Sequence, residues 1–400
     1  MNYYALAALL LLGAAGAGYG LGRLRLPAPG PKACFYAMLT MSVLFAGVYL
    51  ALGVWKLETC QMGLWDFGIY DSLLHNAASG HGLMQDFRGP FDHFSLPTLL
   101  LLPFYLIADT PYWLVAFQAL AMAAAAPVLY ALARCYFRTG PVPLVLAALY
   151  LLNPYYSRLV LFDFHIECLF PLLLFAAFLA RAKHRPVLFA VLMLMLPVIK
   201  EDFVIALGGA GLYFLTVRNE RKFGAVFLAG ALFWTLFVLK IYYPVILGSP
   251  YIHYGRYPVL GVDAAETFRN SWTILSRVLR PNVPMVALSV LLPFAFLPSG
   301  AWRMLLLFWL PTLGIQLVSD SPHQILLISH YGSALLGVTP VVALFGLRTL
   351  RWQLRRRPVA WRQLVAAAAV LGVLCHIFFA DLPLNRYMTY FPTYQKQFHG

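Results

Sequence analysis

The stretch LPTLLLLPFYLIA at residues 96–108 decides how this chain is threaded through a membrane. It is apolar but only about 13 residues long and contains Pro97 and Pro103, whereas a spanning helix needs about 20 residues. The next apolar run, 111–133, is long enough to span. If both runs crossed, Arg134 and Arg138 would emerge on the outer face, and every later basic cluster would also lie on the wrong face. We therefore expect 96–108 to lie in the outer interface or to re-enter it.

The composition indicates that the main solvent of the chain is lipid. The 400 residues are 62% hydrophobic and 11% charged, with a mean hydropathy of +0.75, which excludes an ordinary soluble protein. The net charge of +14 would suggest nucleic acid in a soluble protein. Here Lys and Arg fall in short connections between apolar runs, so we read them as topology signals and expect no nucleic-acid partner. The five cysteines form no CxxC pair.

The positive-inside rule orients these connections. Basic clusters occur at 23–32, 134–138, 181–185, 218–222 and 348–362, and all of them fall in the cytoplasm if 96–108 does not span. This arrangement predicts an all-α bundle with about twelve spans and both termini outside the cytoplasm. The predicted spans are 3–21, 33–54, 111–133, 142–160, 166–181, 186–199, 203–217, 223–246, 284–297, 301–318, 328–347 and 363–380.

The sequence predicts one integral membrane domain over residues 1–400. The first run, from residue 3, lacks a basic leading region, so we expect it to stay as a span and not to be cleaved. Two long outer connections are predicted, one at 55–110 with helices lying on the membrane surface and one at 248–283. The second is rich in Tyr, Arg and His, which suits either a cover for a cavity or an aromatic belt at headgroup level. A short outer tail follows at 381–400.

Polar residues collect at the outer ends of the predicted spans. They lie in five motifs: Asp66 and Asp71 in WDFGIYD, Asp92 and His93 in DHFSLP, Asp163, His165 and Glu167 in DFHIE, Lys200, Glu201 and Asp202 in KED, and His330 and Tyr331 in SHYGS. Ionisable residues within apolar segments are costly and point to function. One face of the membrane is therefore predicted to carry the chemistry.

The DFHIE motif has two geometries. A helix would place Asp163 and Glu167 on one face, whereas an extended turn would align them with His165. Either way two carboxylates lie close together, so we expect a compensating group: Arg158, Lys200, a metal ion or a protonated partner. The alternative is a solvated turn without a function.

The other motifs also have simple structural explanations. The acids of WDFGIYD could face water, KED could form a salt-bridged cap between two spans, and His93 and His330 could be ordinary interfacial histidines. Histidine and carboxylate together can hold a divalent cation, although no spacing here is diagnostic. The candidate metal ligands are Asp66, Asp163, His165 and Glu167.

Taken in order, WDFGIYD, DHFSLP, NPYY, DFHIE, KED and SHYGSALLGVTP resemble a family of uncharacterised prokaryotic membrane proteins with a domain of unknown function. The resemblance covers roughly residues 40–347. That family is similar in architecture to the GT-C glycosyltransferases, which carry an acidic residue in their first outer loop. Asp66 matches that position best and Asp71 next.

The resemblance implies an enzyme of the prokaryotic inner membrane that transfers a sugar from a polyprenyl-phosphate donor to an acceptor on the extracytoplasmic face. Such a transfer needs a general base and a positive group against the departing phosphate. We assign Asp66 as the base or as a carboxylate that positions the acceptor, with Asp71 as the next candidate. Asp163 and Glu167 are supporting or metal-binding acids, and Lys200, Arg158 or His330 lie against the phosphate. The remaining candidate substrate-binding residues are His93, His165, Glu201, Asp202 and Tyr331.

Two other classes of protein remain open at this point. A transporter or flippase of a lipid-linked or small polar substrate would place its ionisable residues near the middle of the membrane, often in repeated halves. A scaffold without catalysis would leave the outer motifs without a purpose. The charges gather at one face and no repeat is visible, which favours the enzyme.

Overall fold

The computed structural model describes residues 3–24, 29–83, 93–217, 219–251, 255–260 and 264–381. These residues form helices and, within the described ranges, no strand, which confirms the predicted all-α class. Asp92 and the tail beyond Asp381 lie outside the described residues.

Among the described residues, seven helical segments are long and apolar enough to cross a membrane, and each matches a predicted span. They are α1 (Tyr3–Arg23), α2 (Pro31–Glu58), α5 (Tyr112–Tyr136), α12 with η4 (Arg221–Ile246), η8 to α17 (Leu297–Val318), α18 to α19 (Pro322–Gln353) and α20 (Pro358–Phe379). Two bent pairs raise the count to nine if each is one span. The pairs are α6 (Val142–Leu151) with α7 (Pro154–Leu161), bent by 45°, and α14 (Ser271–Val278) with Val283–Phe294, bent by 55°.

The predicted count of about twelve spans is not confirmed. The runs expected at 166–181 and 203–217 form α8 (Leu169–Ala182) and α11 (Val204–Thr216), which have 14 and 13 residues. The run at 186–199 divides into α9 (Pro186–Leu194) and α10 (Leu196–Ile199). Helices α8 and α11 fall short of about 18 residues because polar turns precede them, at η2 (Ile166–Cys168) and η3 (Glu201–Phe203).

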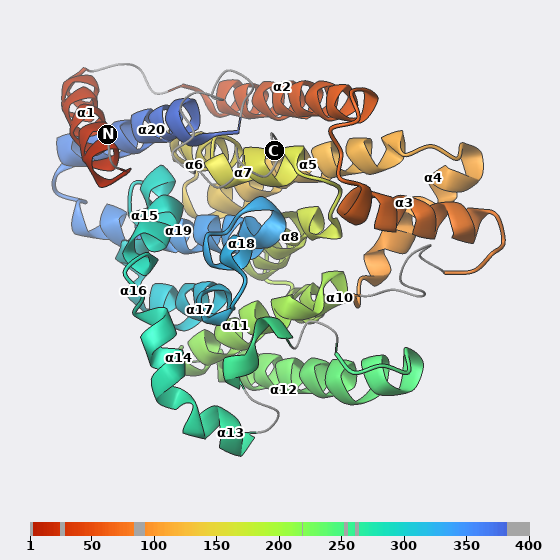
Figure 1. The fold of residues 1–400 in the computed structure, drawn as a ribbon. Helices are drawn as coiled ribbons and strands as arrows, with labels where there is room; N and C mark the ends of the chain where they lie inside the picture. The colour runs from red at the N-terminus through yellow and green to blue at the C-terminus, as the bar shows by residue number, and fades with distance from the viewer. Residues whose placement is uncertain are drawn as a thin grey trace.

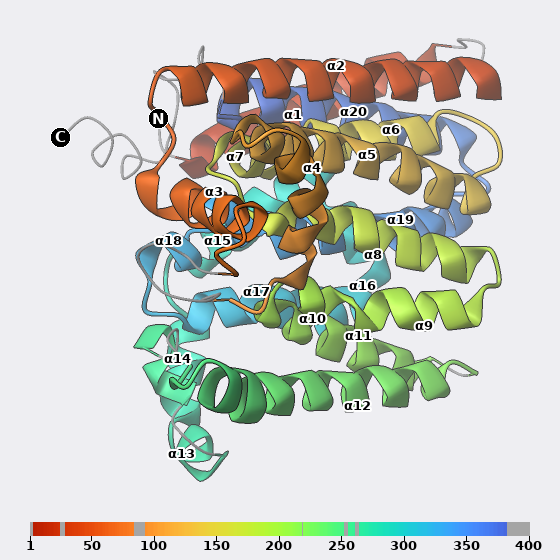
Figure 2. The same ribbon diagram turned by 90° about the vertical axis from the view of Figure 1, so that its right-hand side faces the viewer.

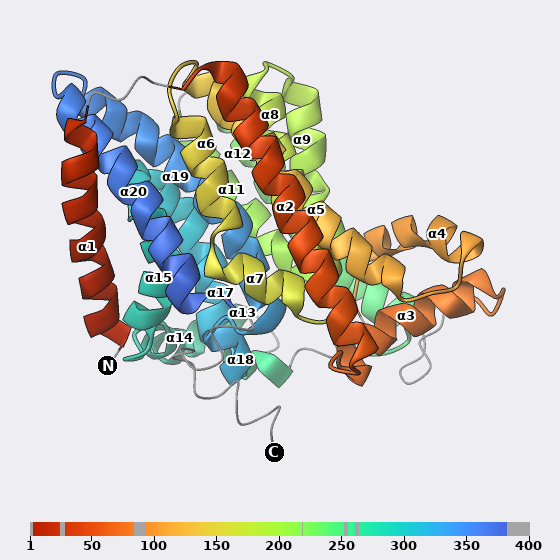
Figure 3. The same ribbon diagram turned by 90° about the horizontal axis from the view of Figure 1, so that it is seen from above.

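The first long connection forms short helices beside the bundle. They are α3 (Leu64–Ala78), η1 (Leu96–Leu101) and α4 (Leu102–Ile107). The decisive stretch at 96–108 is therefore a short helix outside the seven candidate spans, and Figure 3 shows α3 and α4 standing out to one side of the bundle. The Tyr105 hydroxyl donates a hydrogen bond to Asp71 Oδ1 at 2.7 Å, which ties α4 to α3. The second connection contains η6 (Pro258–Leu260) and α13 (Ala264–Arg269).

Burial separates interior helices from those that face lipid. In the most apolar window of each span, 83% of the residues are buried in Pro322–Gln353 but only 17% in Arg221–Ile246. Figure 1 shows α2 along one edge of the bundle and α12 along the opposite edge, with α5, α8 and α19 between them. The exposed apolar faces of α2 and α12 fit lipid as their solvent.

The two ends of the bundle differ in character. Figure 2 shows α3, α14 and α18 at one end together with the start of α1, whereas the turn between α8 and α9 lies at the other end. That turn carries Arg181, Lys183 and Arg185. We call the end with α3 and α18 the polar end.

Helix α1 packs closely along α20 through small residues. A Cβ atom at Gly18 would lie 2.5–2.8 Å from Ala367, and one at Gly22 would lie 2.5–2.6 Å from Gln363. Between helices in lipid, glycines four residues apart allow this close approach and the dispersion contacts that follow from it. Gly16 has no atom within 4 Å of the corresponding position.

We expect Gly18→Val to separate α1 from α20 and to lower the thermal stability of the purified protein, because the added methyl groups collide with the backbone of Ala367. Gly16→Val adds the same side chain to open space and is the matched control. Thermal unfolding in detergent compares the two. Equal losses of stability in both variants would contradict the close packing described for Gly18.

Candidate functional site

A single side chain of α5 organises the turn that holds DFHIE. The Gln118 amide donates hydrogen bonds to the backbone carbonyls of Leu159, Val160 and Phe162 at 3.1–3.3 Å. Its Oε1 accepts a hydrogen bond from the backbone N–H of His165 at 2.8 Å. Buried backbone groups without partners are costly, especially in lipid. Gln118 therefore allows the chain to leave α7 and to form a non-helical turn at 162–165, because it supplies the hydrogen bonds that a helix would otherwise provide.

The turn is extended and not helical. His165 has φ −142° and ψ 129°, and η2 begins only at Ile166, so the extended alternative for DFHIE is the correct one. The side chains nevertheless diverge. Asp163 turns toward α3, where its Oδ1 accepts the backbone N–H of Gly63 at 2.8 Å, while His165 and Glu167 face the interior.

Asp163 anchors the start of α3. Gly63 is the residue that precedes the first turn of this helix, where a negative charge is favoured. A Cβ atom on Gly63 would lie 2.2 Å from Asp163 Oδ2, so the close approach requires glycine. Burial raises the pKa of Asp163, while the Gly63 N–H and the Lys56 ammonium oppose that rise.

Glu167 and Lys200 form a buried ion pair. Lys200 Nζ donates to Glu167 Oε1 at 2.7 Å, and the two side chains are 6% and 2% exposed. The sequence suggested Arg158, Lys200, a metal ion or a proton as the compensating group; for Glu167 the structure supplies Lys200. The pair joins the turn before α8 to the turn before α11.

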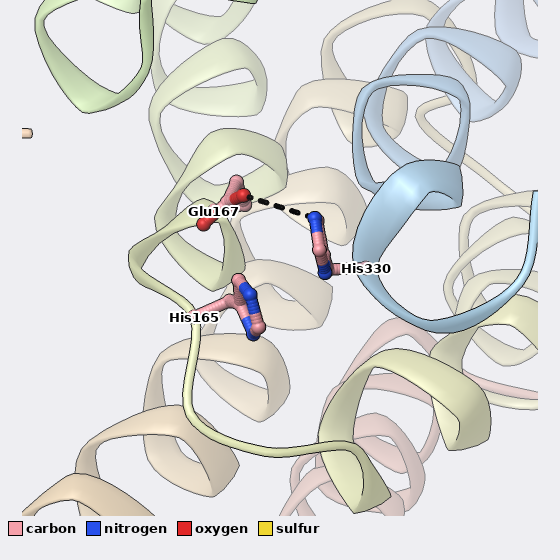
Figure 4. A group of neighbouring side chains, drawn as sticks. All are labelled: His165, Glu167 and His330. Atoms are coloured by element: carbon pink, nitrogen blue, oxygen red, sulfur yellow. Dashed lines mark ion pairs between the residues drawn. The ribbon is translucent and has the colours of Figure 1, made fainter. Parts of the chain in front are cut away.

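Two histidines complete what we call the buried cluster: His165, Glu167, Lys200 and His330. The rings of His165 and His330 stack with their centroids 3.8 Å apart and their planes at 18°. His330 Nε2 lies 3.9 Å from Glu167 Oε1. Figure 4 shows the Glu167 carboxylate facing His330, with the ring of His165 alongside. The four residues of the buried cluster come from three turns that are far apart in the sequence, before α8, α11 and α19.

The KED motif is divided between two partners. Lys200 belongs to the buried cluster, whereas Glu201 Oε1 lies 2.7 Å from His93 Nδ1. Glu201 Oε2 also accepts the backbone N–H of Phe94 at 3.2 Å. Asp202 is half-buried and interacts electrostatically with Lys200. The three charges thus bind elements from distant parts of the chain, and they do not form a local cap.

The acids of WDFGIYD lie on α3. Asp66 is half-buried in the first turn of the helix and interacts electrostatically with Asp163. One turn later, the ring of Tyr70 contacts the ring of His165 edge to face at 5.9 Å. Asp71 is bonded to Tyr105, and burial raises its pKa while that hydrogen bond lowers it. Asp66 therefore lies near Asp163 on the helix whose Tyr70 contacts the buried cluster, and Asp71 holds α3 against α4.

Arg158 and Tyr331 have partners of their own. Arg158 Nε lies 3.7 Å from Asp381 Oδ2 at the end of α20, so it is not the partner of Glu167. The Tyr331 hydroxyl accepts a hydrogen bond from Arg256 at 3.1 Å. Arg256 belongs to the connection 248–283, and its backbone carbonyl accepts the Asp320 N–H at 2.8 Å. This connection is therefore fixed to the segment that carries His330.

Sequence reasoning missed three residues that build this site. Gln118 is a lone amide in an alanine-rich span, and its position in an apolar run was the available signal. Lys56, near the end of α2, donates to the carbonyl of Leu161 at 2.5 Å and adds a positive charge near Asp163. Gly63 precedes WDFGIYD, and only the structure reveals its contact with Asp163.

The fold and the site together define a polytopic α-helical membrane protein with an ionisable cluster at one end of its bundle. The chain belongs to the family DUF2079, described as a predicted membrane protein, which matches residues 56–399. A comparison with curated proteins finds no match.

We expect Gln118→Leu to lower the free energy of unfolding by about 1–2 kcal/mol, because four backbone groups of the turn at 159–165 lose their partner. Gln316→Leu is the matched control, since the buried Oε1 of Gln316 has no hydrogen-bond partner in the part of the chain that the structure describes. Denaturant unfolding in detergent measures both. A loss for Gln316→Leu as large as that for Gln118→Leu would contradict this role of Gln118.

We expect Lys200→Met to destabilise the protein by about 3–5 kcal/mol, because Glu167 would keep its charge in a buried place without a cation. The double variant Lys200→Met/Glu167→Gln removes both charges and should recover most of that stability. Thermal unfolding of the two variants tests the pair. If Lys200→Met alone were as stable as the wild type, the ion pair between Lys200 and Glu167 would not contribute to stability.

Proposed function

We propose that the protein is a membrane glycosyltransferase. It takes a sugar from a polyprenyl-phosphate donor and transfers it to an acceptor hydroxyl at the polar end of the bundle. The polar end would face the extracytoplasmic side of the prokaryotic inner membrane. The basic turn between α8 and α9 at the opposite end supports this orientation, because positive connections stay in the cytoplasm.

One observation carries the proposal: the DFHIE turn lies between an acid on α3 and a buried cation. The charge of Asp66 on α3 is near enough to Asp163 to repel it, and the backbone carbonyl of Asp163 lies 3.0 Å from His165 Nδ1. His165 stacks on His330, which faces Glu167, and Glu167 holds Lys200. A base and a positive group near one another are what glycosyl transfer from a lipid phosphate requires.

Asp66, His330 and Lys200 have separate roles in the proposed transfer. Asp66 accepts the proton of the acceptor hydroxyl while the acceptor oxygen bonds to the anomeric carbon of the sugar. The bond from that carbon to the phosphate oxygen breaks, and the phosphate leaves with the bonding electrons. His330 and Lys200 stabilise its negative charge. The direct displacement inverts the anomeric configuration.

Asp163 and Asp71 support this reaction by position. Asp163 fixes the start of α3 through Gly63 and so sets where Asp66 lies. Asp71 fixes the same helix to α4 through Tyr105. Because α3 lies beside the bundle next to α4, Asp66 is within reach of an acceptor that approaches along the membrane surface.

Asp66→Asn should lower kcat by about 10²–10⁴-fold, since the amide cannot take the proton, while expression and membrane insertion stay unchanged. Asp109→Asn is the matched control, because Asp109 is paired with His75 on the exposed side of α4. Release of polyprenyl phosphate from labelled donors, by protein reconstituted in liposomes, measures the rate. Retained activity in Asp66→Asn would refute the role of Asp66.

The buried Glu167–Lys200 pair between interrupted helices also suits a transporter or flippase of a lipid-linked substrate. The same liposomes distinguish the two functions. Movement of the labelled donor across the bilayer without cleavage of its sugar–phosphate bond would favour transport. Cleavage that depends on Asp66 would favour the transferase.

A further inference from the structure

Three members of the buried cluster converge at one point. His165, Glu167 and His330 each offer one ligand atom, and these atoms all lie within 4.8 Å of one another. Figure 4 shows the three side chains gathered from the turn before α8 and the turn before α19. We propose that they bind one divalent transition-metal ion of the zinc class.

An unpartnered carboxylate oxygen supports this site. Glu167 Oε2 is buried and has no hydrogen-bond partner among the described residues, in a residue that is only 1% exposed. Buried polar atoms are normally bonded, so each unpartnered one calls for an explanation. Glu167 keeps one oxygen for Lys200 and has a second one for an ion.

The separation between His330 and Glu167 also fits an ion. The 3.9 Å between Nε2 and Oε1 is too long for a hydrogen bond. Two ligands of a tetrahedral ion with bonds of about 2.0–2.2 Å lie roughly 3.3–3.6 Å apart. Because Oε1 already accepts from Lys200, a small rotation of the carboxylate that turns Oε2 toward the ion would bring Glu167 and His330 Nε2 into coordination together.

His165 is already oriented as a ligand. Its Nδ1 lies 3.0 Å from the Asp163 carbonyl, so this nitrogen carries the proton and Nε2 keeps its lone pair. Its backbone N–H is held by Gln118. Metal-binding histidines commonly donate their other ring N–H to a carbonyl or carboxylate, which fixes the ring and its tautomer.

The ligand types select the metal. Two imidazoles and one carboxylate suit zinc and its neighbours, whereas Mg²⁺ and Ca²⁺ prefer sets of oxygen ligands. Three protein ligands leave a fourth position open. Asp66 and Asp163, expected as metal ligands from the sequence, are not part of this group, and Asp163 is bonded to Gly63.

Lys200 gives the site a positive balance. A dication and one ammonium outweigh the single negative charge of Glu167, so the open position favours an anion such as a phosphate oxygen. Only the assignment of a phosphate oxygen to the open position rests on the proposed transferase function. The metal site itself depends on the three side chains alone.

Metal binding by the full-length protein in detergent tests the proposal. After treatment with a chelator, the protein should take up one Zn²⁺ per chain, measured by elemental analysis, in the presence of excess Mg²⁺. Co²⁺ in its place should give visible absorption bands from the ligand field. His165→Ala and His330→Ala should weaken Zn²⁺ binding roughly 100-fold or more, because even indirect partners of a metal contribute about 10–100-fold.

Two further variants serve as controls. His184→Ala removes an exposed histidine from the turn between α8 and α9 and should leave binding unchanged. Asp66→Asn should still bind Zn²⁺ although it loses transfer, which separates a failure of the metal site from a failure of the transferase proposal.

Glu167→Gln should also lose Zn²⁺, and if it does not fold, the two histidine variants decide, since they leave the Lys200 pair intact. No Zn²⁺ uptake, or uptake that His165→Ala and His330→Ala do not weaken, would overturn the proposal.

Discussion

The ion pair between Glu167 and Lys200 is the interaction on which the polar end depends. Either charge without the other would be costly in this buried place. If one of the two turns moved, the charge on the other turn would lose its partner. The pair holds the turn before α8 against the turn before α11, and the stacked histidines extend this connection to the turn before α19. The three polar turns that interrupt the apolar sequence, before α8, α11 and α19, are therefore joined to one another.

The interruptions explain both the fold and its difference from the expected one. Hydropathy predicted each of the seven long spans, because a run of about 20 apolar residues leaves few alternatives in lipid. The expected count of about twelve is not confirmed where the chain turns through polar residues, at 162–168 and 200–203, since α8 and α11 begin only after those turns. The polar residues of DFHIE and KED therefore both form the candidate site and delay the start of α8 and α11.

Sequence reasoning predicted the membership of the site better than its pairings. DFHIE, KED and SHYGS were expected to lie at one end of the bundle, and His165, Glu167, Lys200 and His330 do meet there. Arg158 binds Asp381 and Glu201 binds His93, and these contacts depend on packing between distant segments that no local pattern encodes. Gln118 was missed for the same reason, because its partners lie in another helix.

The central claim is that the polar end with Asp66 on its rim is where a lipid-linked substrate reacts. A structure of the protein with a non-cleavable polyprenyl-phosphate sugar analogue tests this claim most directly. The account predicts the sugar beside Asp66, the phosphate toward His330 and Lys200, and the lipid chain leading out between helices into the bilayer. A ligand bound at the basic end, or away from α3, would contradict it.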